Sequence, residues 1–176
     1  MTEPVGAADE RPHLVALCTG NAARSVMAAL MLSERDPRFR VTGAGTHAIE
    51  GLPMSNRTRD ALAGLGLADP GHRSRQLTAE HVADAVLVVA FEPNHVAYVR
   101  RLHPEAAERT ATLPRLVRDL GPGPSDLADR VAALSLAEAE LEPWEEVVDP
   151  AGGDADTFAA CAAEVSSLID ALVERL

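Results

Sequence analysis

The sequence predicts one α/β domain with a doubly wound, four-stranded parallel sheet flanked by helices. Short apolar runs of strand length alternate with segments of helical period, and this alternation is typical of parallel sheets that are covered on both faces. The length of 176 residues and the hydrophobic content of 47% suit a single globular domain. The first twelve residues are polar and acidic, unlike a signal peptide. We therefore expect a disordered tail over 1–12 and the domain over 13–176.

Four segments have the composition of strands. The first is an apolar run that begins at His13 and ends at Cys18, and the clearest buried strand is the run AVLVVA. A shorter candidate is followed by Gly43 and Gly45, which we expect to end it. The expected strands are 13–17, 38–41, 85–90 and, less strongly marked, 110–113.

Helix signals lie between these runs. Ser55 or Asn56 can cap a helix that Gly66 ends, and Thr78 begins a short one. Asp154 or Asp156 suits the N-terminus of a final helix. The expected helices are 22–32, 56–65, one after residue 78, 94–102, 126–139 and one from about 154 to the end. The apolar positions of the last recur at helical period: Phe158, Cys161, Val165, Leu168, Ile169 and Leu172.

Composition excludes several classes of protein. Of the net charge of −11, none comes from residues 1–125, which hold 14 acidic and 14 basic side chains, whereas 126–176 hold 13 and 2. With no basic stripe and 3% aromatic residues we expect no nucleic-acid partner. No apolar run is long enough to span a membrane. All 16 basic residues are arginine, which excludes a P-loop lysine and a lysine Schiff base.

The cysteines and histidines indicate neither a disulfide scaffold nor a metal site. Cys18 and Cys161 are the only cysteines and lie far apart, and the histidines show no ligand spacing. We therefore expect no metal, no cofactor and a reducing cytoplasmic location. Cys161, on the apolar face of the last helix, is interpreted as a core residue.

The segment from Cys18 to Ser25, CTGNAARS, leads from a strand end into a helix start. Consecutive backbone N–H groups in such a loop, together with the helix N-terminus, bind a phosphate dianion. Arg24 adds a bidentate guanidinium, and the positive field favours the thiolate of Cys18, the predicted nucleophile. Ser25 can donate its hydroxyl proton to the sulfur when it leaves. The predicted substrate-binding residues are Thr19, Gly20, Asn21, Ala22, Ala23 and Ser25, of which Gly20 and Asn21 tolerate positive φ.

This loop and several later motifs resemble the low-molecular-weight protein tyrosine phosphatase family, in an actinobacterial-type member related to thiol-dependent arsenate reductases of the same fold. The resemblance covers nearly the whole chain from His13 and is weakest over 119–147. It implies a phosphotyrosine phosphatase I-like sheet of four parallel strands. It is carried by LVALCTGNAARSVMAALML at 14–32, Gly43-Ala-Gly-Thr46, Gly51-Leu-Pro53, His72-Arg-Ser-Arg-Gln-Leu77 and Val148-Asp149-Pro150.

The resemblance implies two further roles. Asp149 matches the general acid of the family, which protonates the leaving group, and Pro150 restricts it to an extended conformation. Neighbouring acidic residues, among them Glu145, Glu146 and Asp154, are expected to favour its protonated form. His72 resembles a histidine that braces the loop together with Asn21 and Ser25.

Four positions depart from the family pattern. Ala23 replaces a second cysteine, which removes a partner for reversible disulfide protection of the nucleophile. Val26 replaces a proline. Gly43 replaces a serine of the bracing network, so the loop is expected to lose a hydrogen bond. Phe91 occupies an aspartate position after the third strand.

The substrate cleft departs further. The aromatic walls of the family fall on Ala48-Ile-Glu50 and Ala151-Gly-Gly153, so the stacking set for phosphotyrosine is absent. We expect the acidic segment that flanks Asp149 to repel acidic peptides. With the stacking set also absent, we expect weak activity on acidic phosphotyrosine peptides and better activity on small or basic partners, unless Trp144, Phe91 or Tyr98 supplies a wall.

The predicted function is therefore phosphate-monoester hydrolysis through a cysteinyl-phosphate, acting as a cysteine-dependent phosphatase on a phosphorylated protein or a small phosphorylated substrate. Arsenate reduction with an external thiol and a phosphate-binding interaction module of low turnover stay open as alternatives. We expect a monomer or a weak dimer.

Overall fold

A computed structural model describes residues 9–176; residues 1–8, and with them most of the expected tail, lie outside the described part. The described chain forms one sheet of four parallel strands in the order β2-β1-β3-β4. This arrangement confirms the predicted fold class. The strands are β1 His13–Cys18, β2 Arg40–Gly45, β3 Ala85–Ala90 and β4 Thr110–Thr112.

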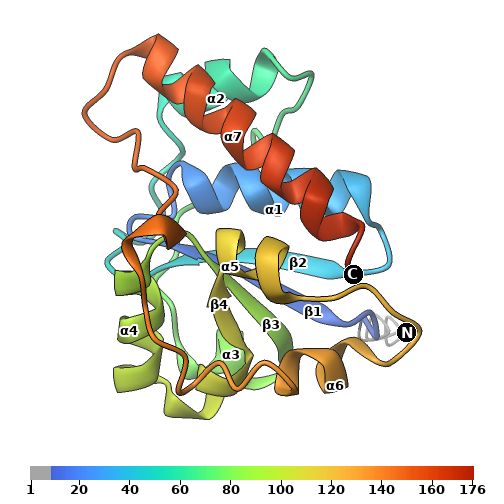
Figure 1. The fold of residues 1–176 in the computed structure, drawn as a ribbon. Helices are drawn as coiled ribbons and strands as arrows, with labels where there is room; N and C mark the ends of the chain where they lie inside the picture. Colours follow the sequence, from blue (N-terminus) through green and yellow to red (C-terminus); the bar gives the residue numbers. More distant parts are fainter. Residues whose placement is uncertain (1–8) are drawn as a thin grey trace, which may run out of the picture.

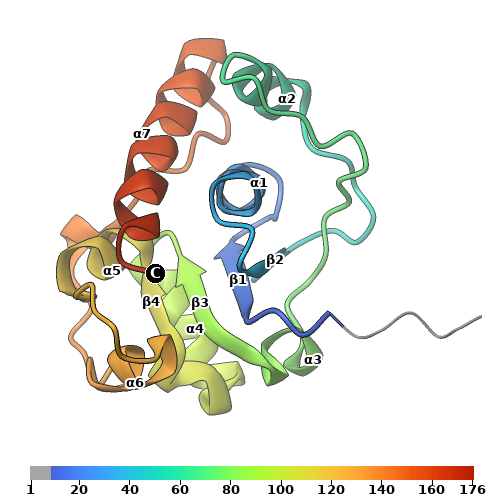
Figure 2. The ribbon, with the colours of Figure 1, turned by 90° about the vertical axis from the view of Figure 1, so that its right-hand side faces the viewer.

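Helices cover both faces of the sheet because its strand residues alternate between two cores. In β1, Leu14 and Ala16 pack toward α1 and α7, whereas Val15 and Leu17 pack toward α3 and α4. Figure 1 shows α1 and α7 on one side of the strands and α4 on the other. Figure 2, which looks along α1, shows α1 and α7 on one side of the strands. The helices are α1 Arg24–Arg35, α2 Asn56–Ala63, α3 Ala79–Ala83, α4 Pro93–Leu102, α5 Leu113–Asp119, α6 Leu127–Ala132 and α7 Ala155–Val173, with 3-10 turns η1 Pro104–Arg109 and η2 Pro143–Glu145.

The helix ends follow the capping residues of the sequence. The Ser55 side chain accepts a hydrogen bond from the Thr58 backbone N–H at 3.2 Å and begins α2. Asp154 accepts one from the Thr157 N–H at 2.9 Å and begins α7. Gly66, with φ of 76°, follows the end of α2 in the left-handed region that favours glycine.

Three expectations for the local structure are wrong. The helix α5 was not expected, because Pro114 at its start and its short length hide the helical pattern; Thr112 caps it through the Arg115 N–H. The helix expected over 126–139 ends at Ala132. The strand β2 runs through both glycines, and a side chain on Gly45 would lie 2.5 Å from the carbonyl oxygen of Thr19.

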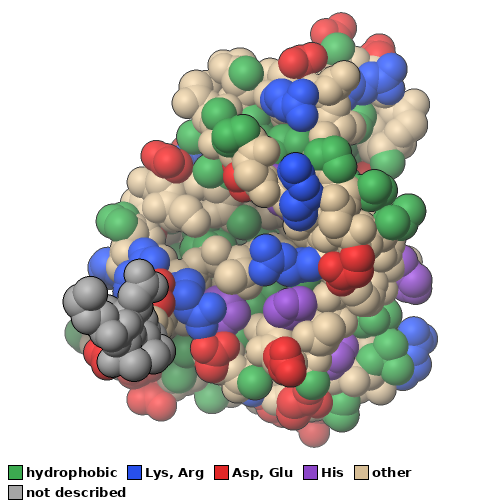
Figure 3. Space-filling model, turned by 180° about the vertical axis from the view of Figure 1, so that it is seen from behind, with side chains coloured by type: hydrophobic (Ala, Val, Ile, Leu, Met, Phe, Trp, Pro, Cys, Tyr) green, Lys and Arg blue, Asp and Glu red, His purple; other side chains and the backbone are tan. Residues whose placement is uncertain are grey.

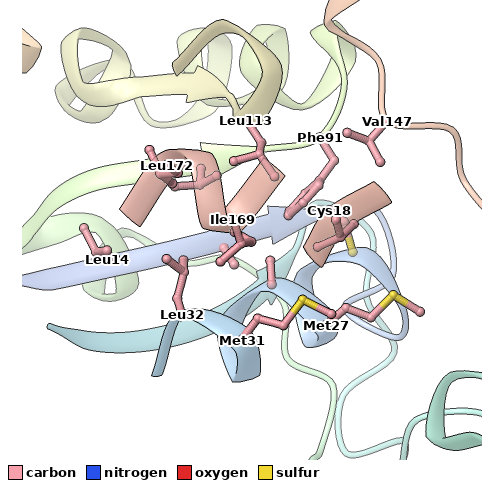
Figure 4. Packing of buried hydrophobic residues seen from close by; sticks show 14 of the residues in the cluster. Leu14, Cys18, Met27, Met31, Leu32, Phe91, Leu113, Val147, Ile169 and Leu172 are labelled. Atoms are coloured by element: carbon pink, nitrogen blue, oxygen red, sulfur yellow. The ribbon is translucent and has the colours of Figure 1, made fainter. Parts of the chain in front are cut away.

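The larger core lies between the sheet, α1 and α7, and Cys18 belongs to it (Figure 4). Side chains from Leu14 on β1, Met27 on α1 and Ile169 on α7 are fully buried there. Cys18 itself is at the carboxyl end of β1, where ligand sites of open parallel sheets are found. Within residues 9–176, no helix is both long and apolar enough to cross a membrane.

Candidate active site

The loop after β1 presents free backbone donors. Cys18 ends the strand and α1 begins at Arg24. The intervening backbone N–H groups, those of residues 19–23, meet no hydrogen-bond acceptor within the described chain. Of the two residues expected to allow positive φ, only Asn21 adopts it, with φ of 50°. A run of free N–H groups leading into a helix N-terminus is a binding site for an anion.

The sulfur of Cys18 lies at the end of a directed chain of hydrogen bonds. The Asn21 side-chain amide donates to Ser25 Oγ at 2.9 Å, and Ser25 Oγ lies 2.9 Å from Cys18 Sγ. Because Ser25 accepts from Asn21, its own hydroxyl proton is available to the sulfur. All three side chains are buried, Cys18 with 3% of its surface exposed.

Asn21 is held by the segment 72–75. Its carbonyl oxygen lies 2.8 Å from His72 Nε2 and accepts from Ser74 Oγ at 2.8 Å, and its side-chain oxygen accepts from the Arg75 N–H at 3.1 Å. His72 is thus in contact with the loop, as expected. A Cβ on Gly43 would lie 2.8 Å from the side-chain nitrogen of Asn21, which donates to Ser25. The expected loss of a hydrogen bond at Gly43 stays a prediction.

Arg24 is nearly completely buried and has three partners. Its Nη1 donates to Glu92 Oε2 and to the Val147 carbonyl, both at 2.8 Å, and its Nη2 lies 3.2 Å from Asp149 Oδ2. Glu92 was missed in the sequence. The sequence offered one signal: Glu92 directly follows Phe91, which occupies the family's aspartate position. Because Phe91 is fully buried, Glu92 is the residue that supplies a carboxylate at the end of β3.

The electrostatics of Glu92 suit this contact. Partial burial is the largest single effect and opposes its ionisation, but the hydrogen bond and the charge of Arg24, together with smaller contributions from neighbouring groups, outweigh it and hold the pKa of the carboxyl below its usual value. Arg24 therefore faces a carboxylate throughout the neutral pH range.

Asp149 comes from the last third of the chain and also lies beside Arg24. Its side chain is 41% exposed, and its Oδ1 accepts a hydrogen bond from the Ala151 N–H at 3.1 Å. The acidic neighbours do not gather around it as expected. Glu145 is fully buried and binds Arg115 through both carboxylate oxygens, at 2.6 and 2.9 Å, while Asp154 caps α7.

A cavity of about 350 Å³ opens beside Cys18. The aromatic ring of Phe158 lines it from α7, and Arg57 lines it from α2 and donates to the Gly153 carbonyl. Phe158 is a wall that the sequence did not reveal, because its spacing marked it as a core residue. The other lining residues are Cys18, Gly20, Ala22, Ala23, Arg24, Ser55, Thr58, Asp149, Ala151 and Gly152.

A smaller cavity of about 200 Å³ shares Gly20 and Ala22 with the first. Its outer wall is aliphatic, and Ile49 and Leu52 there are 68% and 48% exposed. Ile49 belongs to the segment 48–50, where the aromatic wall of the family was expected to be absent. An aliphatic surface therefore takes the place of that aromatic wall.

The three aromatic residues considered as substitute walls do not line the cavity of Cys18. Phe91 is in the core. Trp144 lies under the guanidinium of Arg118, 4.0 Å from its ring centre. Tyr98 accepts from the Gln76 side chain at 3.0 Å.

Two other features lie outside this site. A cavity of about 530 Å³ beside Asn21 is lined by His72, Arg73 and Arg75. Figure 3, the view from behind, shows arginine and histidine side chains gathered near the middle of that face of the molecule. Burial raises the pKa of the Cys161 thiol to about 11, which agrees with its interpretation as a core residue. Among the described residues no His, Cys, Asp and Glu side chains cluster in a way that could hold a metal ion.

Comparison with known proteins gives one consistent result. The family model described as low molecular weight phosphotyrosine protein phosphatase matches residues 13–132. The protein-arginine-phosphatase of Geobacillus stearothermophilus is 32% identical over 165 residues, which are 93% of this chain and 95% of that protein. Low molecular weight protein-tyrosine phosphatase A of Mycobacterium tuberculosis is 36% identical over 104 residues, covering 54% of this chain and 61% of that protein.

Solved structures are similar over most of the chain. The YwlE arginine phosphatase from Geobacillus stearothermophilus superposes with a TM-score of 0.74 at 30% identity, covering 93% of this chain and 91% of that one. The low molecular weight protein tyrosine phosphatase from T. tengcongensis gives a TM-score of 0.75 at 26% identity, covering 94% and 99%.

Proposed function

This chain belongs to the low molecular weight phosphotyrosine protein phosphatase family, and we propose that its cysteine-dependent phosphatase reaction runs through Cys18, Arg24 and Asp149. The Cys18 thiolate attacks phosphorus, a sulfur–phosphorus bond forms, and the bond to the leaving group breaks as Asp149 protonates the departing atom. Water then attacks the phosphocysteine and gives a proton to Asp149. The sulfur leaves as thiolate, and inorganic phosphate is released.

The observation that carries this proposal is the free donor set around one sulfur. Five consecutive backbone N–H groups without acceptors in the described chain, those of residues 19–23, connect Cys18 to the first turn of α1, and Gly20, Ala22, Ala23 and Arg24 line the cavity of Cys18. Donors placed in advance stabilise the charge that develops on a transferring phosphoryl group. The hydroxyl of Ser25, 2.9 Å from the sulfur, stabilises the thiolate when it leaves.

Asp149 takes the role of general acid in this proposal because of its location. It is exposed, lines the cavity of Cys18 and lies within contact distance of Arg24. We propose that a phosphate bound to Arg24 replaces this contact and turns the carboxyl toward the leaving atom. Glu145, the alternative acid in the same segment, is buried against Arg115 and cannot reach the cavity.

The proposed substrate is a phosphorylated protein, with phosphotyrosine and phosphoarginine as the two candidate side chains. The family favours phosphotyrosine. Phosphoarginine is favoured by the similarity over 93% of the chain to a protein-arginine-phosphatase and by the near absence of aromatic walls. The guanidine leaving group of phosphoarginine must take up a proton as the phosphorus–nitrogen bond breaks, but it needs no stacking partner, and Asp149 can supply the proton. A thiolate nucleophile also suits the reducing cytoplasm proposed as its location.

The experiment that tests the mechanism is rapid mixing with p-nitrophenyl phosphate followed by acid quenching. We expect a burst of p-nitrophenol and phosphate bound covalently to Cys18 in the digested protein. Consumption of an external thiol that depends on arsenate, with no burst, would favour arsenate reduction. Tight phosphate binding with neither signal would favour an interaction module.

The substrate is tested with matched peptides that carry phosphotyrosine, phosphoarginine or phosphoserine, together with small phosphorylated metabolites. We expect turnover of the first two and little of phosphoserine. A metabolite hydrolysed with a higher kcat/KM than every peptide would contradict the protein substrate.

A further inference from the structure

A buried histidine lies beside the loop of residues 18–25, called the phosphate loop below, and has no part in the proposed reaction. His95 lies in the first turn of α4 and is 2% exposed. Its Nε2 lies 2.9 Å from the hydroxyl oxygen of Thr19, the residue that follows the nucleophile. Burial of a polar ring costs free energy unless its nitrogens are hydrogen-bonded, and the contact with Thr19 satisfies one of the two ring nitrogens.

The second ring nitrogen of His95 determines the direction of this bond. The backbone N–H of Phe91 donates to His95 Nδ1 at 3.3 Å, so Nδ1 carries no proton. In the neutral ring the proton is then on Nε2, which donates to Thr19 Oγ1. The neutral form is favoured because burial lowers the pKa of His95 to about 4, against the opposing effect of Glu92.

Thr19 is thereby held at two points. Its carbonyl oxygen accepts from the His47 N–H at 2.9 Å, and its hydroxyl accepts from His95. The contact with His47 fixes Thr19 to the end of β2, and the contact with His95 fixes it to the start of α4. Asn21, two residues further on, is fixed by a different segment, 72–75.

The short segment 92–95 therefore holds residues at both ends of the loop. The connection from β3 to α4 carries Glu92, which binds Arg24, and three residues later His95, which binds Thr19. Glu92 Oε2 lies 3.8 Å from His95 Nε2, so the two side chains form one cluster beneath the loop. Their placement couples the first residue after the nucleophile to the guanidinium that binds phosphate.

We propose that His95 is a positioning residue, which holds Thr19 through its Nε2–H and so keeps the first backbone donors of the loop in the geometry that binds the phosphoryl group. This inference rests on the proposed function, because it assigns His95 a role in the same phosphate site. A displaced Thr19 would weaken phosphate binding in the ground state and in the transition state alike.

The test uses the full chain and two readouts, kcat/KM on p-nitrophenyl phosphate and the inhibition constant of vanadate. His95→Phe removes the donor and is expected to weaken both by on the order of tenfold. His95→Gln keeps an N–H near the position of Nε2 and is expected to recover most of the loss. His103→Phe, which replaces another buried histidine at the other end of α4, is the matched control and should leave vanadate inhibition unchanged.

Thr19 completes the test as a double-mutant cycle. Thr19→Val should weaken vanadate inhibition as much as His95→Phe, Thr19→Ser should restore it, and the double variant should lose no more than either single variant. Additive losses, or vanadate inhibition within twofold of wild type in His95→Phe, would overturn the inference. If His95→Phe does not fold, the contrast between Thr19→Val and Thr19→Ser decides the outcome. A wild type without turnover would instead contradict the proposed function.

Discussion

The phosphate loop and the cleft wall meet at Cys18 and differ in how firmly they are held. In the loop, Asn21 makes three hydrogen bonds to the segment 72–75 and a fourth to Ser25, and Arg24 has three partners. The wall consists of exposed aliphatic side chains at Ile49 and Leu52 and of small residues at Ala151 and Gly152.

This difference separates the chemistry from the choice of substrate. Transfer of a phosphoryl group depends on donors fixed before the reaction, and the loop meets that need with buried, fully bonded side chains. Recognition of the leaving group depends on contact area, and here Phe158 is the one aromatic residue among the described residues that line the cavity of Cys18. Changes in the loop should therefore have large effects on every substrate, and changes in the wall should have small effects that vary with the substrate.

The largest effect is expected for Cys18→Ser. A serine hydroxyl is a poor nucleophile without a base, so turnover of p-nitrophenyl phosphate should fall by about 10³-fold or more. Vanadate should still protect the variant against thermal unfolding, because the backbone donors and Arg24 are retained. Iodoacetamide at pH 7.5 should label wild type once and this variant not at all, because the Cys161 thiol, whose pKa burial raises to about 11, stays protonated at that pH. Turnover within tenfold of wild type would place the nucleophile elsewhere.

Asp149→Asn should have the next largest effect, and one that depends on the leaving group. We expect kcat to fall roughly 10²–10⁴-fold on phenyl phosphate, where the leaving oxygen needs a proton. The loss should be much smaller on aryl phosphates whose phenols have a low pKa. The measurement is kcat across a series of substituted aryl phosphates, and Asp154→Asn is the control because Asp154 caps α7. The same loss on every leaving group would contradict the assignment.

Glu92→Gln should have an intermediate effect, since it weakens but does not remove the contact with Arg24. The charge-assisted hydrogen bond at 2.8 Å becomes a neutral one, so kcat/KM should fall by about tenfold. Because the pKa of Glu92 is held below its usual value, the carboxylate is already ionised at neutral pH. The ratio of wild type to variant should therefore stay constant between pH 6 and 8. A ratio that changes with pH over this range would contradict the ionised state of Glu92.

The sequence predicted the loop better than the wall for a physical reason. The loop from Cys18 to Ser25 is a local structure, in which a strand end, a residue that allows positive φ and a helix start are adjacent in the chain. The four strands and the caps at Ser55 and Asp154 are local signals of the same kind. The role of Arg24 as a buried group held by Glu92 is not local, since 68 residues separate them.

The wall depends on residues that come together only in the fold. Phe158 follows the helical period of α7, so the sequence marked it as a core position; the structure confirms that it is buried in the core and shows that it also lines the cavity of Cys18. Glu145 is four residues from Asp149 in the chain and yet points into the protein against Arg115. Proximity in sequence says little about which side of an irregular segment a side chain occupies.

Ile49→Ala is expected to have a small effect that is restricted to the substrate. Its side chain is 68% exposed, so stability should change little, within about 0.5 kcal/mol. Loss of apolar contact should raise KM for an apolar phosphopeptide by a few-fold, on the order of 1 kcal/mol. Vanadate inhibition should not change. Leu102→Ala, at an exposed leucine outside both cavities, is the control, and an equal effect in both variants would contradict a role for Ile49 in the wall.

The smallest effect is expected for Glu146→Gln in the acidic segment before Asp149. The sequence suggested that these charges repel acidic peptides, but Glu145 and Glu142 lie against Arg115, and Arg118 covers Trp144. The remaining exposed charge of Glu146 is screened by salt, so the ratio of KM for acidic and neutral phosphopeptides should change by less than about twofold.

Arg57→Gln is the matched comparison, because Arg57 carries its positive charge at the lining of the cavity of Cys18. This variant should raise KM for the acidic peptide several-fold more than for the neutral one, and the difference should shrink as ionic strength rises. KM measured for both peptides at low and at physiological salt decides between the two residues. A larger shift in Glu146→Gln than in Arg57→Gln would show that the acidic segment, and not the cavity lining, selects the charge of the substrate.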